Sequence, residues 1–423
     1  MEGRENAPNS PWPGLTHGCP VHVLLAEAHG IDSTWFQSFA TQLDTKGVNA
    51  VRHINSVFHD ILKLVPWAVF DRLTAEHLAC GVVRSFTARH QLIALRLAQL
   101  SGASSLRGIE AVMASHGAML YHANASRQRS PLVFSGLFEH LLSAMPRGLR
   151  RKMGDAVRLI GSTGLHLAGP GAQWARFSTT VFGAKAPAVY DPDAARPVYH
   201  AVTAANVNDI TAAKQMPIEP GATYVFDLGY YDSGWWAALD GQGCRLVTRF
   251  KDNTPLREAR AMALPKGSEL LSGRIGFLPA RLDFSRNNPM SCAVREITVQ
   301  TGTGKQLRIL SNDLDAPAQE IADLYKRRWQ IELFFRVMKQ TLKITKFIGR
   351  SENAVRIQIA VALIAFLLLR MLQEMTRVEH GFLELVRLLR ANLMHRKNFT
   401  RLRQTSPPPP VCSRQLQLNW ANT

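Results

Sequence analysis

The stretch from Leu324 to Leu342 carries an acid, two bases and a phenol at spacings that bring them to one side of an expected helix. At about 100° per residue, Tyr325, Arg328, Glu332 and Lys339 fall within an arc of about 60°. Beside them runs an apolar stripe that would let the helix lie on a core, formed by Leu324, Ile331, Phe335, Met338 and Leu342. The polar face could present a reactive carboxylate flanked by cations, or it could be a solvated surface held by ion pairs four residues apart.

The helix that must position this face has start signals a few residues earlier. Asp315 is the candidate N-cap, and Pro317 would stand in the first turn, where a missing N–H costs little. The spacing of the four polar residues resembles the Tyr-Arg-Glu-Lys signature of bacterial insertion-sequence transposases of the insertion sequence four group. The similarity continues around the signature, through IADLYKRRWQIELFFRVMKQ. By that resemblance the chain is a DDE transposase, in which two Asp and one Glu surround divalent metal in a ribonuclease H-like core.

The resemblance also gives each of the four residues a role. Glu332 is the third metal-binding carboxylate, while Tyr325, Arg328 and Lys339 contact DNA at the transposon end. Metal-assisted cutting of a phosphodiester uses two divalent ions about 3.5–4 Å apart, one activating the nucleophile and one stabilising the leaving oxygen. Hard oxygen ligands suit Mg²⁺, so we expect a two-ion Mg²⁺ site.

Asp227 is the second carboxylate that the resemblance implies. It follows the expected strand Thr223–Phe226 in the sequence DLGYYD, where Gly229 permits a tight turn away from the sheet. A single Asp at a strand end often only forms a turn. The match to the family motif favours the catalytic interpretation, so the expected metal ligands are Asp227 and Glu332.

The first carboxylate of the family is missing from this sequence. Similar proteins carry Asp before Ser-Thr in a stretch like LIDSTGLHL, whereas this chain reads LIGSTGLHL with Gly161 at that position. Asp155 lies six residues upstream, about 20 Å along an extended strand, and cannot stand in. Either this copy is inactivated, or water or another acid such as Asp232 completes the site. We favour inactivation, because a site without one ligand loses charge and geometry together.

Strand patterns dominate the sequence on both sides of Asp227. Three antiparallel strands are expected from VRLIGSTGLHL, TTVFGAKAPAVYD and RPVYHAVTAANVNDI, beginning at Val157. Short helices are expected at Ala212–Met216 and Ser233–Asp240. Further strand signals follow in CRLVTRF, SGRIGFL, AVREITVQ and KQLRILSN, and Gly302 and Gly304 predict a hairpin in TGTGK rather than a phosphate loop.

These patterns predict an α/β fold, and together with the family resemblance they imply a ribonuclease H-like mixed-sheet catalytic core interrupted by a mostly β insertion, with a helical N-terminal DNA-binding region and a helical C-terminal segment. The expected boundaries are 51–152 for the DNA-binding region, 153–350 for the core with its insertion at about 244–312, and 351–423 for the C-terminal helices and tail. Residues 1–50 are proline-bearing and are expected to be a non-native or loosely ordered extension, because similar chains begin near Val51.

The N-terminal region contains a possible helix-turn-helix. A helix over Thr87–Leu100, the turn SGASS and a helix over Leu106–Ser115 have the right order. Such a pair is also a common piece of helical bundles, so its order alone does not establish DNA contact. The family resemblance adds that this region recognises terminal inverted repeats. A basic cluster ends it, formed by Arg147, Arg150, Arg151 and Lys152.

Composition favours a polyanionic partner. Fifty Lys plus Arg against 32 Asp plus Glu give a formal charge of +18, and the hydrophobic content of 46% is ample for packed cores. The five cysteines are far apart and contain no C-x-x-C pair, which favours a reducing compartment and not a zinc site. The most apolar run, Ile359–Leu369, is too short to span a bilayer and is expected to be a buried helix. We therefore expect a cytoplasmic protein, associated with the bacterial nucleoid through DNA, and no membrane partner.

The sequence as a whole predicts an insertion-sequence transposase that acts as a homodimer on double-stranded DNA, at inverted-repeat ends and at the target. Two other functions are compatible with the residues: a catalytically dead end-binding protein that represses related elements, and a nuclease or RNA-processing enzyme of the same fold. His166 and Trp174 could touch DNA, or could fill polar and apolar positions of the core. Trp235, Trp236 and Trp329 could stack on an exposed base, but core packing is the expected role of each.

Overall fold

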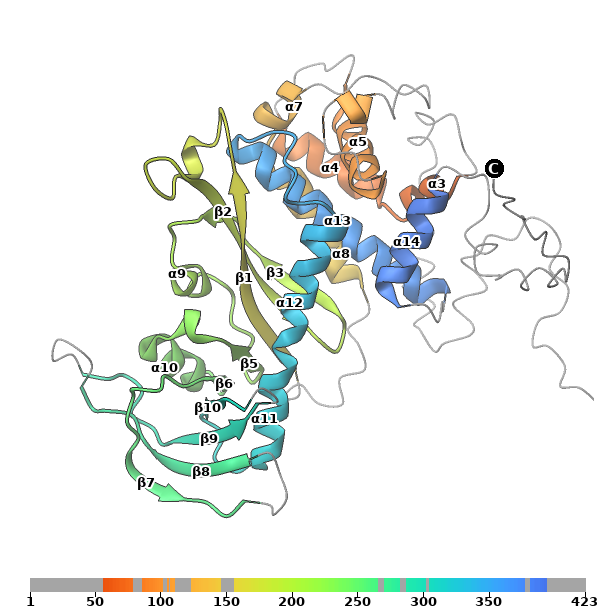
Figure 1. Cartoon of the computed structure of the whole chain (residues 1–423). Coiled ribbons are helices and arrows are strands. Elements are labelled where there is room, and N and C mark those ends of the chain that lie inside the picture. Colours follow the sequence, from red (N-terminus) through yellow and green to blue (C-terminus); the bar gives the residue numbers. More distant parts are fainter. Residues whose placement is uncertain are drawn as a thin grey trace, which may run out of the picture.

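One mixed sheet of ten strands runs through the part of the chain that the computed structural model describes, and helices cover both of its faces (Figure 1). The described residues are 56–78, 86–101, 105, 107–110, 123–145, 156–264, 270–281, 287–301, 304–376 and 381–393. The strand order is β3-β2-β1-β5-β6-β10-β9-β8-β7, with β4 paired to β2. The result is a mixed α/β architecture.

The first half of the sheet follows the sequence patterns closely. Its strands are β1 (Val157–Leu167), β2 (Phe182–Asp191), β3 (Arg196–His200), β4 (Thr203–Ala204) and β5 (Thr223–Phe226). β1, β2 and β3 form the expected antiparallel meander, and β5 lies parallel to β1 with Leu159 opposite Val225. The helix expected at Ala212–Met216 instead begins earlier, as α9 (Asp209–Ala213).

The strands of the expected β insertion do not form a separate sheet. They are β6 (Arg245–Arg249), β7 (Arg257–Ala261), β8 (Leu270–Phe277), β9 (Val294–Gln300) and β10 (Gln306–Ser311). β6 pairs in parallel with β5, and β10, β9, β8 and β7 then extend the same sheet in antiparallel order. The β9–β10 hairpin confirms the turn predicted in TGTGK, where Thr301 N donates to Lys305 O at 2.8 Å.

The helix that carries the polar face has a different start and a break. It comprises α11 (Ala318–Arg327), α12 (Trp329–Arg336) and a π-helical turn, η6 (Val337–Thr341). Arg328 joins α11 to α12 with helical backbone angles, so the three pieces follow one course. The N-cap is Pro317, and the expectation of Asp315 there is wrong. Asp313 turns the chain instead, because its Oδ1 accepts from the backbone N–H groups of Asp315 and Ala316.

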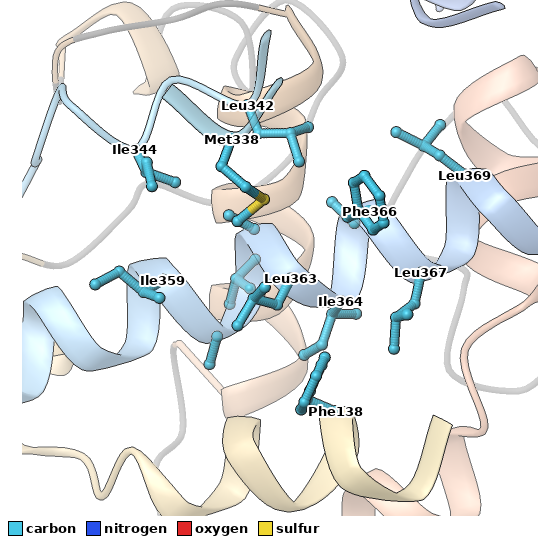
Figure 2. Packing of buried hydrophobic residues seen from close by; sticks show 14 of the residues in the cluster. Phe138, Met338, Leu342, Ile344, Ile359, Leu363, Ile364, Phe366, Leu367 and Leu369 are labelled. Carbon is cyan, nitrogen blue, oxygen red and sulfur yellow. The ribbon is translucent and has the colours of Figure 1, made fainter. Parts of the chain in front are cut away.

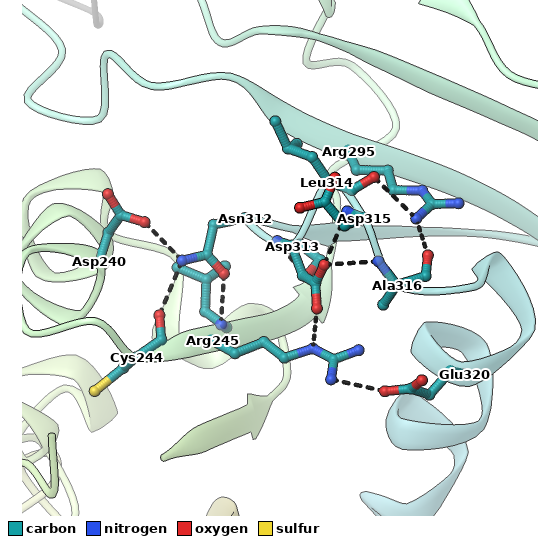
Figure 3. A network of polar contacts seen from close by, with 12 residues as sticks. Asp240, Cys244, Arg245, Arg295, Asn312, Asp313, Leu314, Asp315, Ala316 and Glu320 are labelled. Atoms are coloured by element: carbon teal, nitrogen blue, oxygen red, sulfur yellow. Dashed lines mark hydrogen bonds and ion pairs between the residues drawn. The ribbon is translucent and has the colours of Figure 1, made fainter. Parts of the chain in front are cut away.

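A polar network fixes the beginning of α11 to the sheet (Figure 3). Arg245 of β6 forms ion pairs with Asp313 at 2.9 Å and with Glu320 of α11 at 2.7 Å. Asn312 donates to Asp240 at 2.7 Å and to the carbonyl oxygen of Cys244 at 2.9 Å. These contacts tie α11 to β6, to the end of β10 and to α10 (Ser233–Gly241).

Each face of the sheet has its own core. Leu159 and Leu165 of β1 belong to the larger one, together with the apolar stripe of α11, α12 and η6, whose members are all buried. That cluster includes α13 (Glu352–Thr376), and residues Ile359 to Leu369 are no more than 2% exposed, as expected (Figure 2). Ile160 belongs to the smaller cluster with α9 and α10 on the other face. Among the described residues α13 alone is long and apolar enough to cross a membrane, but 89% of its apolar window is buried inside the protein.

The remaining helices gather around α13 and the far end of β1 (Figure 1). They are α3 (Val57–Lys63), α4 (Trp67–His77), α5 (Ala88–Ser101), α7 (Ala123–Gln128), α8 (Leu132–Ala144) and α14 (Phe382–Asn392). α5 confirms the helix expected at Thr87–Leu100, and it is buried nearly all round. Of the second helix of the possible helix-turn-helix, only residues 107–110 are described, and they are helical. Residues 1–50, the basic cluster at 147–152 and Asp155 lie outside the described residues.

Candidate active site between β1, β5 and α12

Asp227 lies directly after β5, where the chain turns away from the sheet. Its Oδ1 accepts a hydrogen bond from the backbone N–H of Gly229 at 2.9 Å, which caps the short 3-10 helix η4 (Leu228–Tyr230). The carboxylate therefore forms the turn that its sequence position suggested. Only one of its oxygens has this bond, and Asp227 remains half-buried at the sheet edge.

Gly161 lies beside Asp227 on the neighbouring strand. β1 and β5 are parallel with Leu159 opposite Val225, so two residues further along Gly161 is level with Asp227. A Cβ at position 161 would meet Ile331 and Phe335 of α12, at 3.2 Å from each. A side chain at this position would thus face the helix that carries Glu332. The three positions that the sequence resemblance assigns to carboxylates, 161, 227 and 332, lie around this junction of β1, β5 and α12, but the one on β1 has no side chain.

Glu332 is partly exposed on α12 and is paired within its own helix. Its Oε1 lies 3.1 Å from Nη1 of Arg328, and the Arg328 guanidinium lies 5.8 Å from the centre of the Tyr325 ring. Burial raises the pKa of the Tyr325 phenol, and the charge of Arg328 opposes that rise. Three of the four signature residues are therefore one contacting group. Lys339 lies in the π turn of η6, one turn beyond α12.

Asp209 is an acid at this edge that the sequence analysis did not select. It is the first residue of α9, and its Oδ1 accepts from the Ser162 hydroxyl at 2.8 Å and pairs with Lys185 at 3.2 Å. Its Oδ2 faces Gly229: a Cβ built there would lie 3.5 Å from Oδ2 of Asp209 and 3.1 Å from Oδ1 of Asp227. The two carboxylates therefore face the same small space. The expected helix began three residues too late, which left Asp209 in a strand; an acid at the true helix start was the available signal.

The buried hydroxyl of Tyr230 is close enough to the same acids to be affected by their charges. Its side chain is 2% exposed, and among the described residues its hydroxyl has no hydrogen-bond partner of normal geometry, although the Ser162 hydroxyl is near. Burial raises the pKa of the phenol strongly, and the nearby charges of Asp209, Asp227 and Glu332 add to the rise. The phenol is thus neutral and can donate a proton toward a bound oxygen.

The donors at this edge suit a divalent cation in their chemistry. Carboxylate oxygens from Asp209, Asp227 and Glu332 are hard ligands of the kind that Mg²⁺ prefers. At Gly229, which is exposed, a Cβ would meet Oδ1 of Asp227 and Oδ2 of Asp209. Within the described ranges, no three His, Cys, Asp or Glu side chains are arranged to enclose a metal ion as they stand. A bound ion therefore requires the carboxylates to turn inward.

The other acid named from the sequence, Asp232, has a structural role. Its Oδ1 accepts from the backbone N–H of Trp235 at the start of α10, and its Oδ2 lies 2.7 Å from Lys214. Trp235 and Trp236 are buried in the smaller core, which confirms their expected packing role. Trp329 is 54% exposed, so the expectation that it packs in the core is wrong.

A cleft of about 440 Å³ lies next to the signature residues. Its floor is apolar and comes from the sheet, including Leu270, Val299 and Leu307. Its rim comes from the helix, with Tyr325, Arg328 and Trp329 among the lining residues. The helix side of the cleft carries an acid as well as cations and aromatic rings, since Asp323 and Arg328 line it together with Trp329. Neither His166 nor Trp174 lines this cleft. His166 is exposed on β1, and Trp174 donates from Nε1 to the carbonyl oxygen of Arg350.

Comparison with protein families gives two matches along the chain. A family described as transposase DDE domain matches residues 152–368, which include Gly161, Asp227 and Glu332. A family described as a domain of unknown function (DUF4372) matches residues 53–124.

Individual proteins give the same result. A transposase of Sinorhizobium fredii is 37% identical over 289 residues, which cover 68% of this chain and 80% of that protein. A transposase for insertion sequence element IS5377 of Geobacillus stearothermophilus is 26% identical over 325 residues, covering 72% and 82%. Among solved structures, a piggyBac transposase synaptic complex with hairpin DNA has a TM-score of 0.45 and 9% identity, covering 88% of this chain and 82% of that one.

Proposed function

We propose, from the premise that this chain belongs to the DDE transposase family, that it binds the terminal inverted repeats of an insertion sequence and acts on DNA there. The membership makes it a transposase by family, and its relatives include transposases of bacterial insertion sequences. The spacing of Tyr325, Arg328, Glu332 and Lys339 supports a place in the insertion sequence four group. The antiparallel meander followed by the parallel strands β5 and β6 supports a ribonuclease H-like core.

The proposed reaction is metal-dependent DNA strand cleavage followed by strand transfer. When bound, Mg²⁺ would supply an activated water or hydroxyl and would stabilise the leaving oxygen. Asp227 and Glu332 would hold the ion through carboxylate oxygens. Arg328 and Lys339 would neutralise backbone phosphates, and Tyr325 would bind the DNA end beside them.

The observation that carries this proposal is the meeting of positions 161, 227 and 332 at one edge of the sheet. β1 brings Gly161 level with Asp227, and the Cβ direction at 161 points to the neighbours of Glu332 on α12. Since Gly161 provides no ligand, we propose that cleavage by this copy is impaired. A two-ion site with only two of its three carboxylates has lost one charge and one constraint on geometry.

The second candidate function follows from the same glycine. Arg328 and Trp329 still line the cleft while the first carboxylate is absent, which favours a protein that occupies transposon ends without cutting them and represses active relatives. End binding that persists without Mg²⁺-dependent nicking would distinguish this repressor from the enzyme. We further propose a homodimer on DNA and a cytoplasmic location.

The test is nicking of a labelled inverted-repeat end in Mg²⁺ by the full chain and by its Gly161→Asp variant. Gly164→Asp is the matched control, because Gly164 is exposed on the same strand and a Cβ there has no atom within 4 Å. Cleavage by Gly161→Asp alone supports the assignment. Equal cleavage by all three proteins means that position 161 does not supply the first ligand. If the natural chain does not bind the inverted-repeat end at all, the proposed function itself is contradicted.

A further inference from the structure

We propose that Arg249 binds the phosphate of the DNA end that lies at the candidate active site, and that this chain holds that phosphate without a divalent cation. The inference deepens the proposed function and rests on it, because it takes the inverted-repeat end as the ligand. It adds a phosphate contact from the sheet to the contact already proposed for Arg328 on the helix. No motif in the sequence marks Arg249, and only the pairing of the strands shows where it lies.

Arg249 is level with Gly161 and Asp227 in the sheet. β1, β5 and β6 are parallel neighbours, and their register places positions 161, 227 and 249 in one row. Phe226 of β5 pairs with Thr248 of β6, one residue before that row. Neighbouring strands are about 4.8 Å apart, so Arg249 begins about 10 Å from Gly161, and Asp227 lies between them.

The side chain of Arg249 lies on the face of the sheet that α11 and α12 cover. Val247, two residues earlier on β6, belongs to the larger core together with the apolar stripe of these helices. Leu246 and Phe250 belong to the smaller core on the other face. Since side chains alternate along a strand, Arg249 points to the same side as a Cβ at position 161 would.

The guanidinium of Arg249 has no partner in the part of the chain that the structure describes. Its Nε is buried without a hydrogen bond, and the group forms no ion pair with a described carboxylate. The acids beside it have other contacts: Asp227 accepts from the backbone of Gly229, and Glu332 pairs with Arg328. A partly buried cation without an acceptor is costly, and such a group is normally satisfied by a bound molecule. For a guanidinium that molecule is an anion.

The phenol of Tyr325 connects Arg249 with the helix. Burial raises the pKa of this phenol, and the charges of Arg328 and Arg249 oppose the rise while the charge of Asp227 adds to it. Both guanidinium groups are therefore near one phenol, one coming from the sheet and one from the helix. Planar N–H forks match the oxygens of a phosphate, which accept two donors from each fork.

The balance of charge at this edge also favours a phosphate. The described acids here are matched by bases: Asp209 pairs with Lys185, Glu332 pairs with Arg328, and Asp227 has Arg249 level with it. An aspartate at position 161 would be an acid without such a counterpart, and it would repel a phosphate unless a cation lay between them. Because this chain has glycine there, arginines alone can hold the phosphate.

The test is binding of a labelled inverted-repeat end by the full chain in EDTA, measured by fluorescence anisotropy. Two ends are compared, one natural and one with an uncharged methylphosphonate in place of the phosphate that joins the element to the flanking DNA. The methylphosphonate should weaken binding by the natural chain about tenfold. It should weaken binding by Arg249→Ala less than about twofold, because the contact is already lost in that variant. A methylphosphonate placed one helical turn inside the repeat should affect both proteins equally.

The matched control is Arg260→Ala, since Arg260 is an exposed arginine of the same sheet, on the edge strand β7. Whatever its effect on overall affinity, this variant should show the same methylphosphonate effect as the natural chain. Arg249→Lys keeps the charge but loses the fork, so its methylphosphonate effect should be intermediate. Circular dichroism checks that each variant is folded.

The part of the inference that concerns the cation is tested with Gly161→Asp. In EDTA this variant should bind the natural end at least about threefold more weakly than the natural chain, and Mg²⁺ should restore its binding. The natural chain should bind equally well with and without Mg²⁺ at constant ionic strength. Binding by the natural chain that requires Mg²⁺, or equal binding by both proteins in EDTA, overturns this part.

The phosphate contact is overturned if Arg249→Ala shows the full methylphosphonate effect while the natural chain still prefers the inverted repeat to an unrelated duplex. That result would leave the proposed function standing. If the natural chain binds both duplexes equally, the proposed function is contradicted, and the inference falls with it.

Discussion

Gly161 of β1 lies level with Asp227, which directly follows the parallel strand β5, and a side chain on Gly161 would touch Ile331, the residue before Glu332. The contact brings together β1, where an acid is missing, and α12, which lies 170 residues later in the chain. A Cβ at 161 would lie 3.2 Å from apolar atoms of Ile331 and Phe335, so these side chains would have to shift slightly to admit an acid there.

Restoring the acid should work better when that space is enlarged. A Cβ at 161 is 3.2 Å from both Cδ1 and Cγ2 of Ile331, which is closer than ordinary van der Waals contact. We expect Gly161→Asp together with Ile331→Val to nick an inverted-repeat end faster than Gly161→Asp alone, although losing the methyl group costs about 0.5–1.5 kcal/mol of stability. Rates are measured under single-turnover conditions. Ile331→Val by itself should give no gain, and a double variant slower than Gly161→Asp would contradict the packing argument.

Arg328 should contribute to DNA binding through a phosphate. Arg328→Ala is expected to weaken binding of an inverted-repeat end and to reduce the slope of log affinity against log salt by about 1. The matched control is Arg356→Ala, because Arg356 is also an arginine paired with a glutamate on its own helix, Glu352 on α13. Fluorescence anisotropy at several salt concentrations measures both. An unchanged slope for Arg328→Ala would remove this residue from the DNA interface.

Two tryptophans should respond to truncation in opposite ways. Trp236 is fully buried and donates from Nε1 to the carbonyl oxygen of Tyr230 at 3.1 Å, so Trp236→Ala should lower the free energy of unfolding by about 3–5 kcal/mol. Trp329→Ala should change it little, because the side chain is 54% exposed, but it should weaken binding of the DNA end. Urea unfolding and anisotropy separate the effects. A strongly destabilised Trp329→Ala would refute a surface role.

Stability should fall on the acidic side of neutrality because of His200. Burial, together with the charge of Arg356, lowers the pKa of His200 from 6.5 to about 4. Between those two values the unfolded chain binds a proton that the folded chain does not, so stability is complete above about pH 6.5 and is lost as the pH falls toward 4. The loss from this group is at most about 3 kcal/mol.

The measurement is the free energy of urea unfolding at a series of pH values. His200→Gln, which cannot gain a proton, should flatten the profile in this window, whereas His166→Gln on the exposed part of β1 should leave it unchanged. His200 packs edge-on against Phe138 at 4.8 Å between ring centres, so some uniform destabilisation of His200→Gln is expected at every pH. A profile with an unchanged slope would show that His200 does not control the acid response.

Much of the fold could be predicted because its signals are local. β1 and β5 were predicted with their observed ends, since alternation and flanking turns mark a strand within its own few residues. The joining of β6 to β5 could not be predicted, because strand order depends on contacts between distant segments. Because the order of the strands was unknown, residues 244–312 were expected to be an insertion into the core, whereas their strands belong to the same sheet as the core strands.

Residues of the candidate site could be proposed from the sequence only where a motif supplied them. Asp227 and Glu332 stand in matching sequence patterns, and the structure brings their elements to one edge. Asp209 was missed because helix α9 has five residues, too short for a helical pattern to show where it begins. The contact of Asp209 with Ser162 joins residues 47 positions apart, and no spacing rule connects them.

The continuous sheet has a mechanical consequence. β6 is bonded to β5 on one side and to β10 on the other, and Arg245 within it holds α11 through Glu320. A displacement of the outer strands β7, β8 and β9 would therefore be transmitted through the hydrogen-bonded strands to β5 and to Asp227, which directly follows it.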